Sequence, residues 1–522
     1  MIQSTPFAFR FATFRVPTIA RSTNRFLATK ADTITLKHSS GRVFENIPTS
    51  LFIGGQFVPS VSGKTFETVD PNTGRVIAAV AEAQAEDVDI AVKHASEAFK
   101  NTWSKTSPEQ RGKLLSKLAD LVNRDAELLA GIEAYDNGKP FKQALAADIS
   151  LVEQHLRYFA GWADKIDGRV IDVNKSVHVY TRTEPFGVVG QIIPWNFPLL
   201  MLAWKIAPAL AAGNTIVLKT SEKTPLSALK LAQLINEAGF PAGVVNILSG
   251  FGATAGDAIA RHKDIRKVSF TGSTATGKKI MSASAESNLK KVSLELGGKS
   301  PNIVFNDAIL EKAVDSCITG FVFNQGQVCC AGTRVFVQEG IYNAFIARLK
   351  EKVAAIKVGP SFDESTAMGP LVDKLQFDKV LGYLEDGKKA GAKVETGGKR
   401  IGTEGYFVEP TIFSGVDEGM KIVKEEIFGP VISVLKFKTD DEVIERANAT
   451  EFGLAASVHT ESYSTAVRVS HALESGTVWI NGHNKLSASV PFGGHKQSGF
   501  GSDGGIEAIK EYTKTKAVFV TL

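Results

Sequence analysis

The sequence predicts an α/β protein built on parallel β-sheets that carry helices on both faces. Between residues 186 and 297, short runs of β-branched residues alternate with helical segments, and a second stretch of this kind begins near Lys299. Such alternation is typical of parallel strands joined by crossover helices. The chain has 522 residues, 43% of them hydrophobic, so it is long enough for two or three domains with large cores.

The region before residue 162 is predicted to consist mostly of helices and short strands. Residues 85–129 carry apolar side chains at spacings of three and four, which predicts helix. Within them, Ser107-Pro108-Glu109 marks a helix start, because proline fits the first helical turn. Residues 169–183 alternate weakly between apolar and polar side chains, and we expect an exposed hairpin there.

The alternating regions supply the strands of the predicted sheets. In the first region we expect strands at 188–193, 215–219, 244–248 and 267–270, with helices at 199–211 and 227–238. In the second region we expect strands at 334–337, 431–435 and 476–481. Parallel sheets of this kind bind ligands at the carboxyl ends of their strands, so the residues that follow these strands are candidates for a functional site.

Basic residues are concentrated in the first 30 residues. This leader has five basic residues and no acidic one, which accounts for the whole net charge of +5. The neutral remainder gives no reason to expect nucleic-acid binding. Arginines spaced among Phe, Ser and Thr are typical of a mitochondrial transit peptide. We expect cleavage near residues 25–28 and a location in the mitochondrial matrix; a disordered tail without a targeting role is the alternative.

The longest apolar stretch, residues 185–213, is predicted to be a buried strand, turn and helix. It contains Gln191, Asn196 and Lys205 together with four prolines, which argues against a membrane span. The chain has 3 cysteines, too few for a disulfide framework, and its 9 histidines form no cluster. We therefore expect no membrane contact and no metal site.

A glycine-rich segment follows the strand predicted at 267–270. From Thr271 to Lys279 it contains two glycines and several hydroxyl groups where a helix is expected to begin, and free amides at such a place bind phosphate or pyrophosphate. The segment is close to a triphosphate-binding loop, but Lys279 occupies the position of the Mg²⁺-binding hydroxyl. A tightly packed turn without a ligand is the other interpretation.

Cys329 and Cys330 are candidates for a nucleophile. Small and polar residues surround them, which favours the access that a reactive thiolate needs. The alternative is burial as small hydrophobic residues, which we expect for Cys317 among apolar residues at helical spacing.

Two further polar residues are candidates for catalysis. Glu295 lies between two leucines at the end of a strand-like run, where half-burial would raise its pKa and suit a general base. A glutamate on an edge strand that faces solvent is the alternative. Asn196 lies in a turn between two prolines, where its amide can donate to an oxyanion or can only stabilise the turn.

Seven segments, in order, resemble those of the NAD(P)-dependent aldehyde dehydrogenases, and the chain resembles the mitochondrial, class 2-like enzymes among them. The resemblance runs from about residue 50 to residue 517. The segments are 194–198 (PWNFP), 218–222 (LKTSE), 270–273 (FTGS), 294–299 (LELGGK), 326–332 (GQVCCAG), 425–430 (EEIFGP) and 491–494 (PFGG).

The resemblance implies an aldehyde dehydrogenase-like α/β fold. Its parts are a Rossmann-type parallel-sheet domain for NAD at 35–162 and 186–297, an α/β catalytic domain at 298–497, and oligomerisation elements at 163–185 and 498–522. Residues 1–30 stay outside this fold as the expected transit peptide.

The resemblance also implies oxidation of aldehydes to carboxylic acids with reduction of NAD(P). Cys329 is then the nucleophile, which forms a thiohemiacetal and then a thioester, with Cys330 as a bystander. The Asn196 side chain and the Cys329 backbone N–H hold the oxyanion. Glu295 activates the water that releases the acid.

By the same resemblance, a set of residues binds the cofactor. It comprises Gly272 and Ser273 at the pyrophosphate, Lys219 and Glu222 at the adenine ribose, Glu426 at the nicotinamide ribose, and Ile192, Pro194 and Trp195 nearby. The Glu222 carboxylate repels a 2′-phosphate, so we expect NAD to be preferred. The positive charge of Lys219 reduces this repulsion, so use of NADP as well stays open.

Phe197, Trp204 and Phe492 match the aromatic walls of the family's substrate tunnel, which suits small aliphatic aldehydes such as acetaldehyde. The resemblance implies a homotetramer. Ser502, Asp503 and Lys514 depart from the family's usual pattern, in a region that the family uses around subunit contacts, so a dimer stays open as the alternative.

Other functions are weighed against this one. A CoA-acylating semialdehyde dehydrogenase is disfavoured, because such enzymes can omit the water-activating glutamate and Glu295 is present. A non-catalytic binding or structural protein on the same fold is disfavoured because Cys329, Glu295 and Asn196 occur together. A P-loop phosphotransferase is disfavoured by Lys279.

Overall fold

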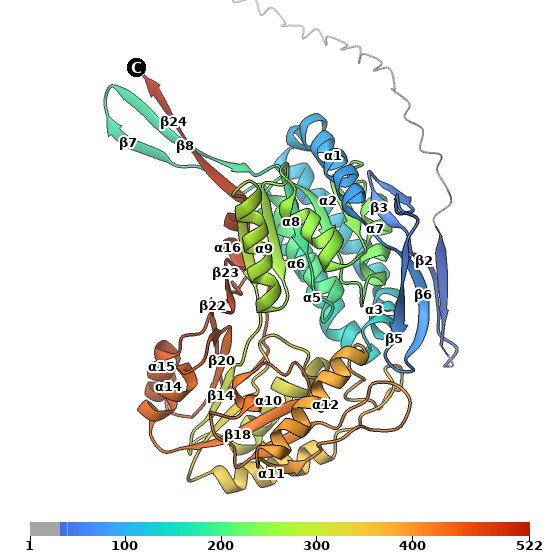
Figure 1. Cartoon of the computed structure of the whole chain (residues 1–522). Helices are drawn as coiled ribbons and strands as arrows, with labels where there is room; N and C mark the ends of the chain where they lie inside the picture. The colour runs from blue at the N-terminus through green and yellow to red at the C-terminus, as the bar shows by residue number, and fades with distance from the viewer. Residues whose placement is uncertain (1–31, 39) are drawn as a thin grey trace, which may run out of the picture.

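The computed structural model describes residues 32–38 and 40–522, which form two lobes and a projecting arm (Figure 1). The expected transit peptide lies outside the described residues. Each lobe is built on its own sheet, and the order of elements along the chain follows the two alternating regions of the sequence. The α/β class with parallel sheets is therefore confirmed.

The first lobe contains an eight-stranded sheet with the order β23-β13-β12-β9-β10-β11-β3-β4. Its five central strands are parallel, and the three edge strands run antiparallel to their neighbours. The strands are β3 Leu51–Ile53, β4 Gln56–Val58, β9 Val188–Ile192, β10 Thr215–Lys219, β11 Val245–Leu248, β12 Lys267–Thr271, β13 Lys291–Glu295 and β23 Gly499–Phe500. The four predicted strands are confirmed to within one residue at each end.

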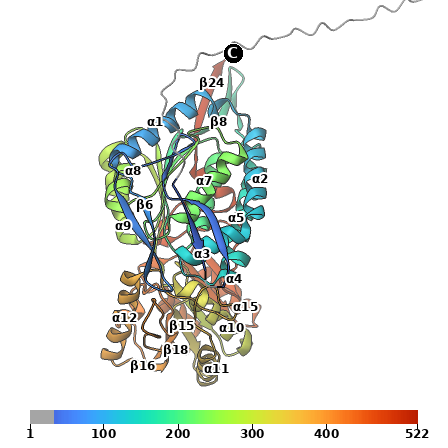
Figure 2. The same ribbon diagram turned by 90° about the vertical axis from the view of Figure 1, so that its right-hand side faces the viewer.

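Helices cover both faces of this sheet, as a fully buried parallel sheet requires. Every residue of β9, β10, β11 and β12 is buried. One face packs against α1, α8 and α9, and the other against α2, α3, α5, α6 and α7 (Figure 2). The helices are α1 Ala85–Asn101, α2 Pro108–Arg124, α3 Ala126–Asp136, α4 Phe141–Gln143, α5 Ser150–Trp162, α6 Pro198–Ala211, α7 Leu226–Ala238, α8 Asp257–Arg261, α9 Thr274–Ser287 and α16 Gly505–Glu511.

Local sequence signals explain several of these boundaries. The Ser107 hydroxyl accepts a hydrogen bond from the backbone N–H of Gln110, and Pro108 is the first residue of α2, as the predicted helix start requires. The apolar stretch at 185–213 forms β9 and α6, with every residue of α6 buried. No helix among residues 32–38 and 40–522 has the length and apolar character needed to cross a membrane.

The second lobe contains a seven-stranded sheet with the order β16-β17-β18-β15-β14-β20-β21, parallel except for β16. Its strands are β14 Pro301–Val304, β15 Arg334–Gln338, β16 Lys393–Thr396, β17 Thr411–Ser414, β18 Val431–Phe437, β20 Ala455–His459 and β21 Thr477–Ile480. Its helices are α10 Leu310–Val322, α11 Tyr342–Ala354, α12 Lys374–Lys389, α13 Lys421–Lys424, α14 Asp440–Asn448 and α15 Tyr463–Ala472. The three strands predicted here are confirmed.

The arm projects from the first lobe and carries the C-terminus (Figure 1). The predicted hairpin is present as β7 Val170–Asn174 and β8 Val177–Pro185, and β24 Thr513–Thr521 pairs antiparallel with all of β8. Smaller antiparallel pairs are β1 Thr33–Lys37 with β2 Val43–Pro48, β5 Thr65–Asp70 with β6 Arg75–Ala81, and β19 Phe452–Gly453 with β22 His495–Lys496. Because β23 pairs with β13, the chain returns to the first lobe after completing the second. The domain limits drawn from the resemblance stay a prediction.

Candidate active site

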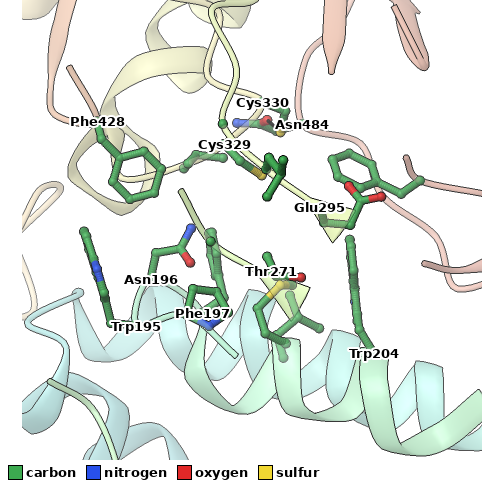
Figure 3. Close-up of a pocket in the computed structure, with 18 of the residues that line it drawn as sticks. Trp195, Asn196, Phe197, Trp204, Thr271, Glu295, Cys329, Cys330, Phe428 and Asn484 are labelled. Carbon is green, nitrogen blue, oxygen red and sulfur yellow. Dashed lines mark hydrogen bonds between the residues drawn. The ribbon is translucent and has the colours of Figure 1, made fainter. Parts of the chain in front are cut away.

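Residues of both lobes line a cavity of about 360 Å³ (Figure 3). The first lobe contributes the turn after β9, helix α6 and the ends of β12 and β13, while the second contributes the segment after α10 and the loop after β21. The cavity therefore lies where the carboxyl ends of the first lobe's parallel strands meet the second lobe. Asn196, Glu295 and Cys329 surround this single space (Figure 3).

Asn196 is held by both its backbone and its side chain. Its backbone oxygen accepts hydrogen bonds from Asn324 Nδ2 at 2.8 Å and from Lys139 Nζ at 3.2 Å. Its own Nδ2 donates to the backbone oxygen of Gln327 at 2.9 Å. A side-chain amide has two N–H donors, so one N–H remains to donate to a group bound in the cavity. The turn-stabilising role and the donor role considered for Asn196 are therefore compatible.

Cys329 lies in a strained backbone segment that follows α10. Asn324, Gln325 and Gly326 adopt positive φ angles of 46°, 58° and 70°, a conformation that non-glycine residues rarely adopt. A Cβ at Gly326 would lie 2.2 Å from the Gly429 backbone oxygen, so only glycine fits there. Cys329 is half-buried, and its contact with Cys330 and its burial raise its pKa well above that of an ordinary thiol.

Cys317, by contrast, is fully buried in the apolar core of the second lobe. Its pKa is raised by burial. The prediction that Cys317 acts as a small hydrophobic residue is therefore confirmed.

Glu295 ends β13 and is 6% exposed, which excludes the solvent-facing alternative. Within the described part of the chain, neither of its carboxylate oxygens has a hydrogen-bond partner. Burial raises the pKa of Glu295 well above its ordinary value, the charge of Asp503 raises it further, and Lys205 opposes the shift. A carboxyl of this kind becomes a base only above its raised pKa.

Lys205 and Asp503 form a buried ion pair that the sequence analysis missed. Their charged atoms lie 2.6 Å apart, and the residues are 1% and 3% exposed. Asp503 was expected in a region near subunit contacts, which stays a prediction; in the structure, reciprocal backbone hydrogen bonds with Phe492 fix it in the cavity wall. The sequence did indicate such a pair, because Lys205 lies within the apolar helix α6 and a buried lysine needs a partner of opposite charge.

The three predicted aromatic residues all line the cavity. The Trp204 and Phe492 rings pack edge to face with centroids 5.3 Å apart, and Phe197 stacks on Phe323 at 6.0 Å. The wall also includes residues that the sequence analysis did not select, namely Asp148, Leu151, Met201, Phe323, Asn484 and Leu486.

The residues predicted to bind a cofactor divide into two groups. Pro194, Trp195, Gly272, Ser273 and Glu426 line the cavity. Ile192, Lys219 and Glu222 lie outside it, at and after the carboxyl ends of β9 and β10.

Lys219 and Glu222 form a pair outside the cavity. Lys219 Nζ donates to the Gly250 backbone oxygen at 3.0 Å and lies 3.3 Å from the Glu222 carboxylate. Burial lowers the pKa of Lys219. The Glu222 side chain is 33% exposed, so it can accept hydrogen bonds from ribose hydroxyls.

The start of α9 fits the pyrophosphate of a dinucleotide. Ser273 is exposed and caps the helix, accepting a hydrogen bond from the Thr276 backbone N–H at 3.3 Å. The helix start therefore faces solvent, where an anion is favoured. A Cβ at Gly272 would lie 2.4 Å from the Phe270 ring, so tight packing explains Gly272 as well. The two interpretations of this glycine-rich segment are therefore compatible.

Glu426 closes the cavity from the second lobe. Its Oε1 accepts a hydrogen bond from the Gly298 backbone N–H at 3.0 Å, and a Cβ at Gly297 would lie 2.6 Å from its Oε2. Burial raises its pKa. Residues 32–38 and 40–522 contain no group of three His, Cys, Asp or Glu side chains that could hold a metal ion.

Comparison with known proteins gives a consistent result. The model of the "Aldehyde dehydrogenase family" matches residues 57–518. An "Aldehyde dehydrogenase" of Emericella nidulans is 56% identical over 91% of this chain and 95% of its own length. "Aldehyde dehydrogenase family 2 member B4, mitochondrial" of Arabidopsis thaliana is 53% identical over 91% and 88%. The NAD+ complex of an aldehyde dehydrogenase from Bacillus cereus superposes with a TM-score of 0.90, at 52% identity over 91% and 96%.

Proposed function

The chain belongs to the aldehyde dehydrogenase family, and from that premise we propose which residues perform the reaction and which aldehydes they accept. The protein is an NAD(P)-dependent oxidoreductase that converts aldehydes to carboxylic acids. The proposal rests on one observation: a thiol, an amide donor and a buried carboxyl, those of Cys329, Asn196 and Glu295, line the same apolar cavity.

Cys329 acts as the nucleophile. The thiol gives its proton to water, its sulfur forms a bond to the aldehyde carbon, and the carbon–oxygen double bond becomes single as the oxygen becomes an oxyanion. The free N–H of Asn196 and the Cys329 backbone N–H donate to this oxyanion. Loss of one such donor costs about 3 to 4 kcal/mol in a transition state. The hydrogen bond to Gln327 holds the Asn196 amide in place, so little reorganisation accompanies the attack.

NAD, when bound, supplies the hydride acceptor that turns this adduct into a thioester on Cys329. Glu295 then removes a proton from water, whose oxygen attacks the thioester carbon. The carbon–sulfur bond breaks, the acid leaves and Cys329 is regenerated. The absence of hydrogen-bond partners for the Glu295 carboxylate within residues 32–38 and 40–522 suits a base that must be free to contact water.

The accepted substrates are small aliphatic aldehydes such as acetaldehyde. Phe197, Trp204 and Phe492 provide apolar, rigid walls close to Cys329. These walls favour an apolar chain and exclude bulk water from the thioester.

NAD is the preferred cofactor. The half-exposed Glu222 carboxylate accepts hydrogen bonds from ribose hydroxyls and repels a 2′-phosphate, and Lys219 beside it reduces that repulsion. The exposed start of α9 would hold the pyrophosphate, and Glu426 would hold the nicotinamide ribose.

The enzyme acts as a homotetramer in the mitochondrial matrix. Exposed apolar residues on the arm, among them Val170 at 74% and Phe519 at 66% exposure, favour burial against another copy of the chain. The basic, Ser- and Thr-containing leader suits a transit peptide, and the Arabidopsis relative is named mitochondrial. Light scattering of the purified protein and N-terminal sequencing of the protein isolated from mitochondria test these two points.

The reaction is tested by following NADH absorbance with acetaldehyde and NAD, and separately with NADP. Cys329→Ala is expected to abolish turnover. Cys317→Ala, in the buried core of the second lobe, is the matched control and should stay active. Turnover that requires added CoA would favour the acylating alternative. Folded protein that oxidises no aldehyde in a panel of chain lengths would favour a binding protein.

A further inference from the structure

We propose that His483 is a positioning residue for the nucleophile, fixing the backbone carbonyl of Cys330 and thereby the orientation of the neighbouring Cys329 thiol. This inference rests on the proposed role of Cys329. His483 follows β21 in the second lobe, is 5% exposed and is not one of the residues that line the cavity.

The hydrogen bonds of His483 define its proton positions. Nε2 lies 3.0 Å from the Cys330 backbone oxygen, and Nδ1 lies 2.5 Å from Oγ of Ser457 in β20. A carbonyl oxygen can only accept, so Nε2 carries the proton and donates to Cys330. In the neutral ring Nδ1 then accepts from the Ser457 hydroxyl, and this bond sets the tautomer. Ser457, His483 and Cys330 thus form one directed chain of hydrogen bonds.

The His483 imidazole is uncharged at neutral pH. Burial lowers its pKa to about 4. At neutral pH the ring is therefore uncharged, and its Nε2–H donates to Cys330. His483 acts as a fixed support for the loop and not as a proton donor in the reaction.

The fold provides a close-fitting site for this ring. A Cβ at Gly320 in α10 would lie 3.2 Å from the ring, and a Cβ at Gly332 would lie 3.1 Å from it. The Trp479 ring packs beside it with centroids 4.8 Å apart. Glycine on two sides and an aromatic ring on a third leave the imidazole little freedom to move.

Cys330 has a second anchor through its side chain. Its thiol donates to Oδ1 of Asn484 at 3.2 Å, and Figure 3 shows the two residues next to each other beside Cys329. Cys330 is therefore held at its carbonyl by His483 and at its thiol by Asn484. Described from the sequence as a bystander, Cys330 becomes the anchor of the nucleophile in this inference.

The loop needs such anchors because its backbone is strained. Asn324, Gln325 and Gly326 enter the loop with positive φ angles, and strained conformations persist only where surrounding contacts hold them. Release of the Cys330 carbonyl would let the segment after Gly326 relax and turn the Cys329 thiol away from the aldehyde carbon. A displacement of about 1 Å at a reacting atom can cost about 10²-fold in rate.

Three variants separate positioning from simple packing. His483→Leu removes both hydrogen bonds, whereas His483→Gln keeps an N–H donor for Cys330 and an oxygen acceptor for Ser457. Cys330→Ala removes the thiol anchor but keeps the carbonyl that His483 holds. Each variant is compared with the unmodified enzyme by the pre-steady-state rate of NADH formation, the aldehyde KM, the NAD Kd and the melting temperature.

His483→Leu is expected to slow the first NADH turnover about 10²-fold, with the NAD Kd and the aldehyde KM unchanged. His483→Gln is expected to recover most of that rate, and Cys330→Ala to lose less than His483→Leu. Wild-type burst rates in folded His483→Leu would overturn the proposal. So would a His483→Gln variant that melts normally but is as slow as His483→Leu.

Ser457→Ala covers the case in which His483→Leu does not fold. It leaves the ring in place but removes one hydrogen bond, so a 2- to 10-fold slower burst is expected, about the effect of one hydrogen bond. An unchanged burst in Ser457→Ala together with an unchanged burst in Cys330→Ala would contradict the positioning role. Activity remaining in Cys329→Ala would instead refute the proposed function itself.

Discussion

The two sides of the cavity control their reactive groups by different means. On the first-lobe side, Glu295 lies near the buried charges of Lys205 and Asp503. On the second-lobe side, a neutral hydrogen bond from His483 to the Cys330 carbonyl and one from the Cys330 thiol to Asn484 hold the residue next to Cys329. On the first-lobe side, charge sets the pKa of Glu295; on the second-lobe side, hydrogen bonds set the position of Cys330.

Because of this difference, substitutions on the two sides of the cavity should affect different properties of the reaction. Charges act over several ångströms in a low-dielectric interior and shift the pKa of a neighbour. Neutral hydrogen bonds act at contact distance, and those of His483 reach a backbone carbonyl that does not titrate, so they fix position. Changes at Asp503 should therefore alter the pH dependence of the reaction, whereas changes at His483 or Ser457, which hold the Cys330 backbone, should alter its rate at every pH.

Glu295→Gln gives the largest expected effect and tests whether the base acts only after hydride transfer. Steady-state turnover should fall about 10²- to 10⁴-fold, the usual contribution of a general base, because the thioester is no longer hydrolysed. The first turnover of NADH should remain as a burst measured by stopped flow. A burst that falls as far as the steady-state rate would place Glu295 in an earlier step.

Asn196→Ala should slow the attack of Cys329 on the aldehyde, a step that Glu295→Gln should leave unchanged. Loss of one oxyanion donor should slow the burst itself about 10²- to 10³-fold, while the NAD Kd is unchanged. Stopped-flow absorbance and NAD titration measure the two quantities. A normal burst with slow steady-state turnover would show that the amide only stabilises the turn.

Asp503→Asn tests the charge-governed side directly. Asp503 raises the pKa of Glu295, and the base form exists only above that pKa, so kcat should rise with pH. Removing the negative charge lowers this pKa and should move the rise to lower pH. Ser457→Ala on the other side is the matched control and should leave the pH profile in place.

The Asp503→Asn result needs a stability control, because Lys205 loses its buried partner and the variant should melt at lower temperature. The pH profile is therefore measured below that melting temperature. A shift of the profile to higher pH would contradict the assigned sign.

Glu222→Gln is expected to have the smallest effect and extends the comparison to the cofactor side of the first lobe. If the charge of Glu222 discriminates between NAD and NADP, loss of the carboxylate should improve kcat/KM for NADP about tenfold relative to NAD, equivalent to about 1.4 kcal/mol. The value of kcat/KM is measured for NAD and for NADP, each with acetaldehyde at saturation. An unchanged ratio would mean that Glu222 does not face the 2′ position.

Much of the fold was predictable because its signals are local. The β-branched runs that became β9, β10, β11 and β12 are short, apolar and bounded by helices, so pattern alone located them. The capped start of α2 at Ser107 is equally local. The seven family segments likewise select Cys329, Glu295 and Asn196 through their immediate neighbours along the chain.

Other features of the site were invisible because they join distant parts of the chain. Asp503 and Lys205 are 298 positions apart; His483 reaches Cys330 from 153 positions away, and Ser457 of β20 holds His483. No local pattern distinguishes a histidine that holds a carbonyl from one that packs in a core. The resemblance assigned Lys219 and Glu222 together to the adenine ribose, and only the structure showed that they form an ion pair outside the cavity.

The sequence by itself determined that this chain is an α/β protein and which thiol, carboxyl and amide are candidates for its chemistry. These depend on residue type, periodicity and neighbours within a few positions. The tertiary structure alone decided which charges face Glu295 and which neutral groups hold the loop of Cys329. Those contacts depend on the closing of two lobes, and electrostatic and hydrogen-bond energies depend on distance in space and not on distance along the chain.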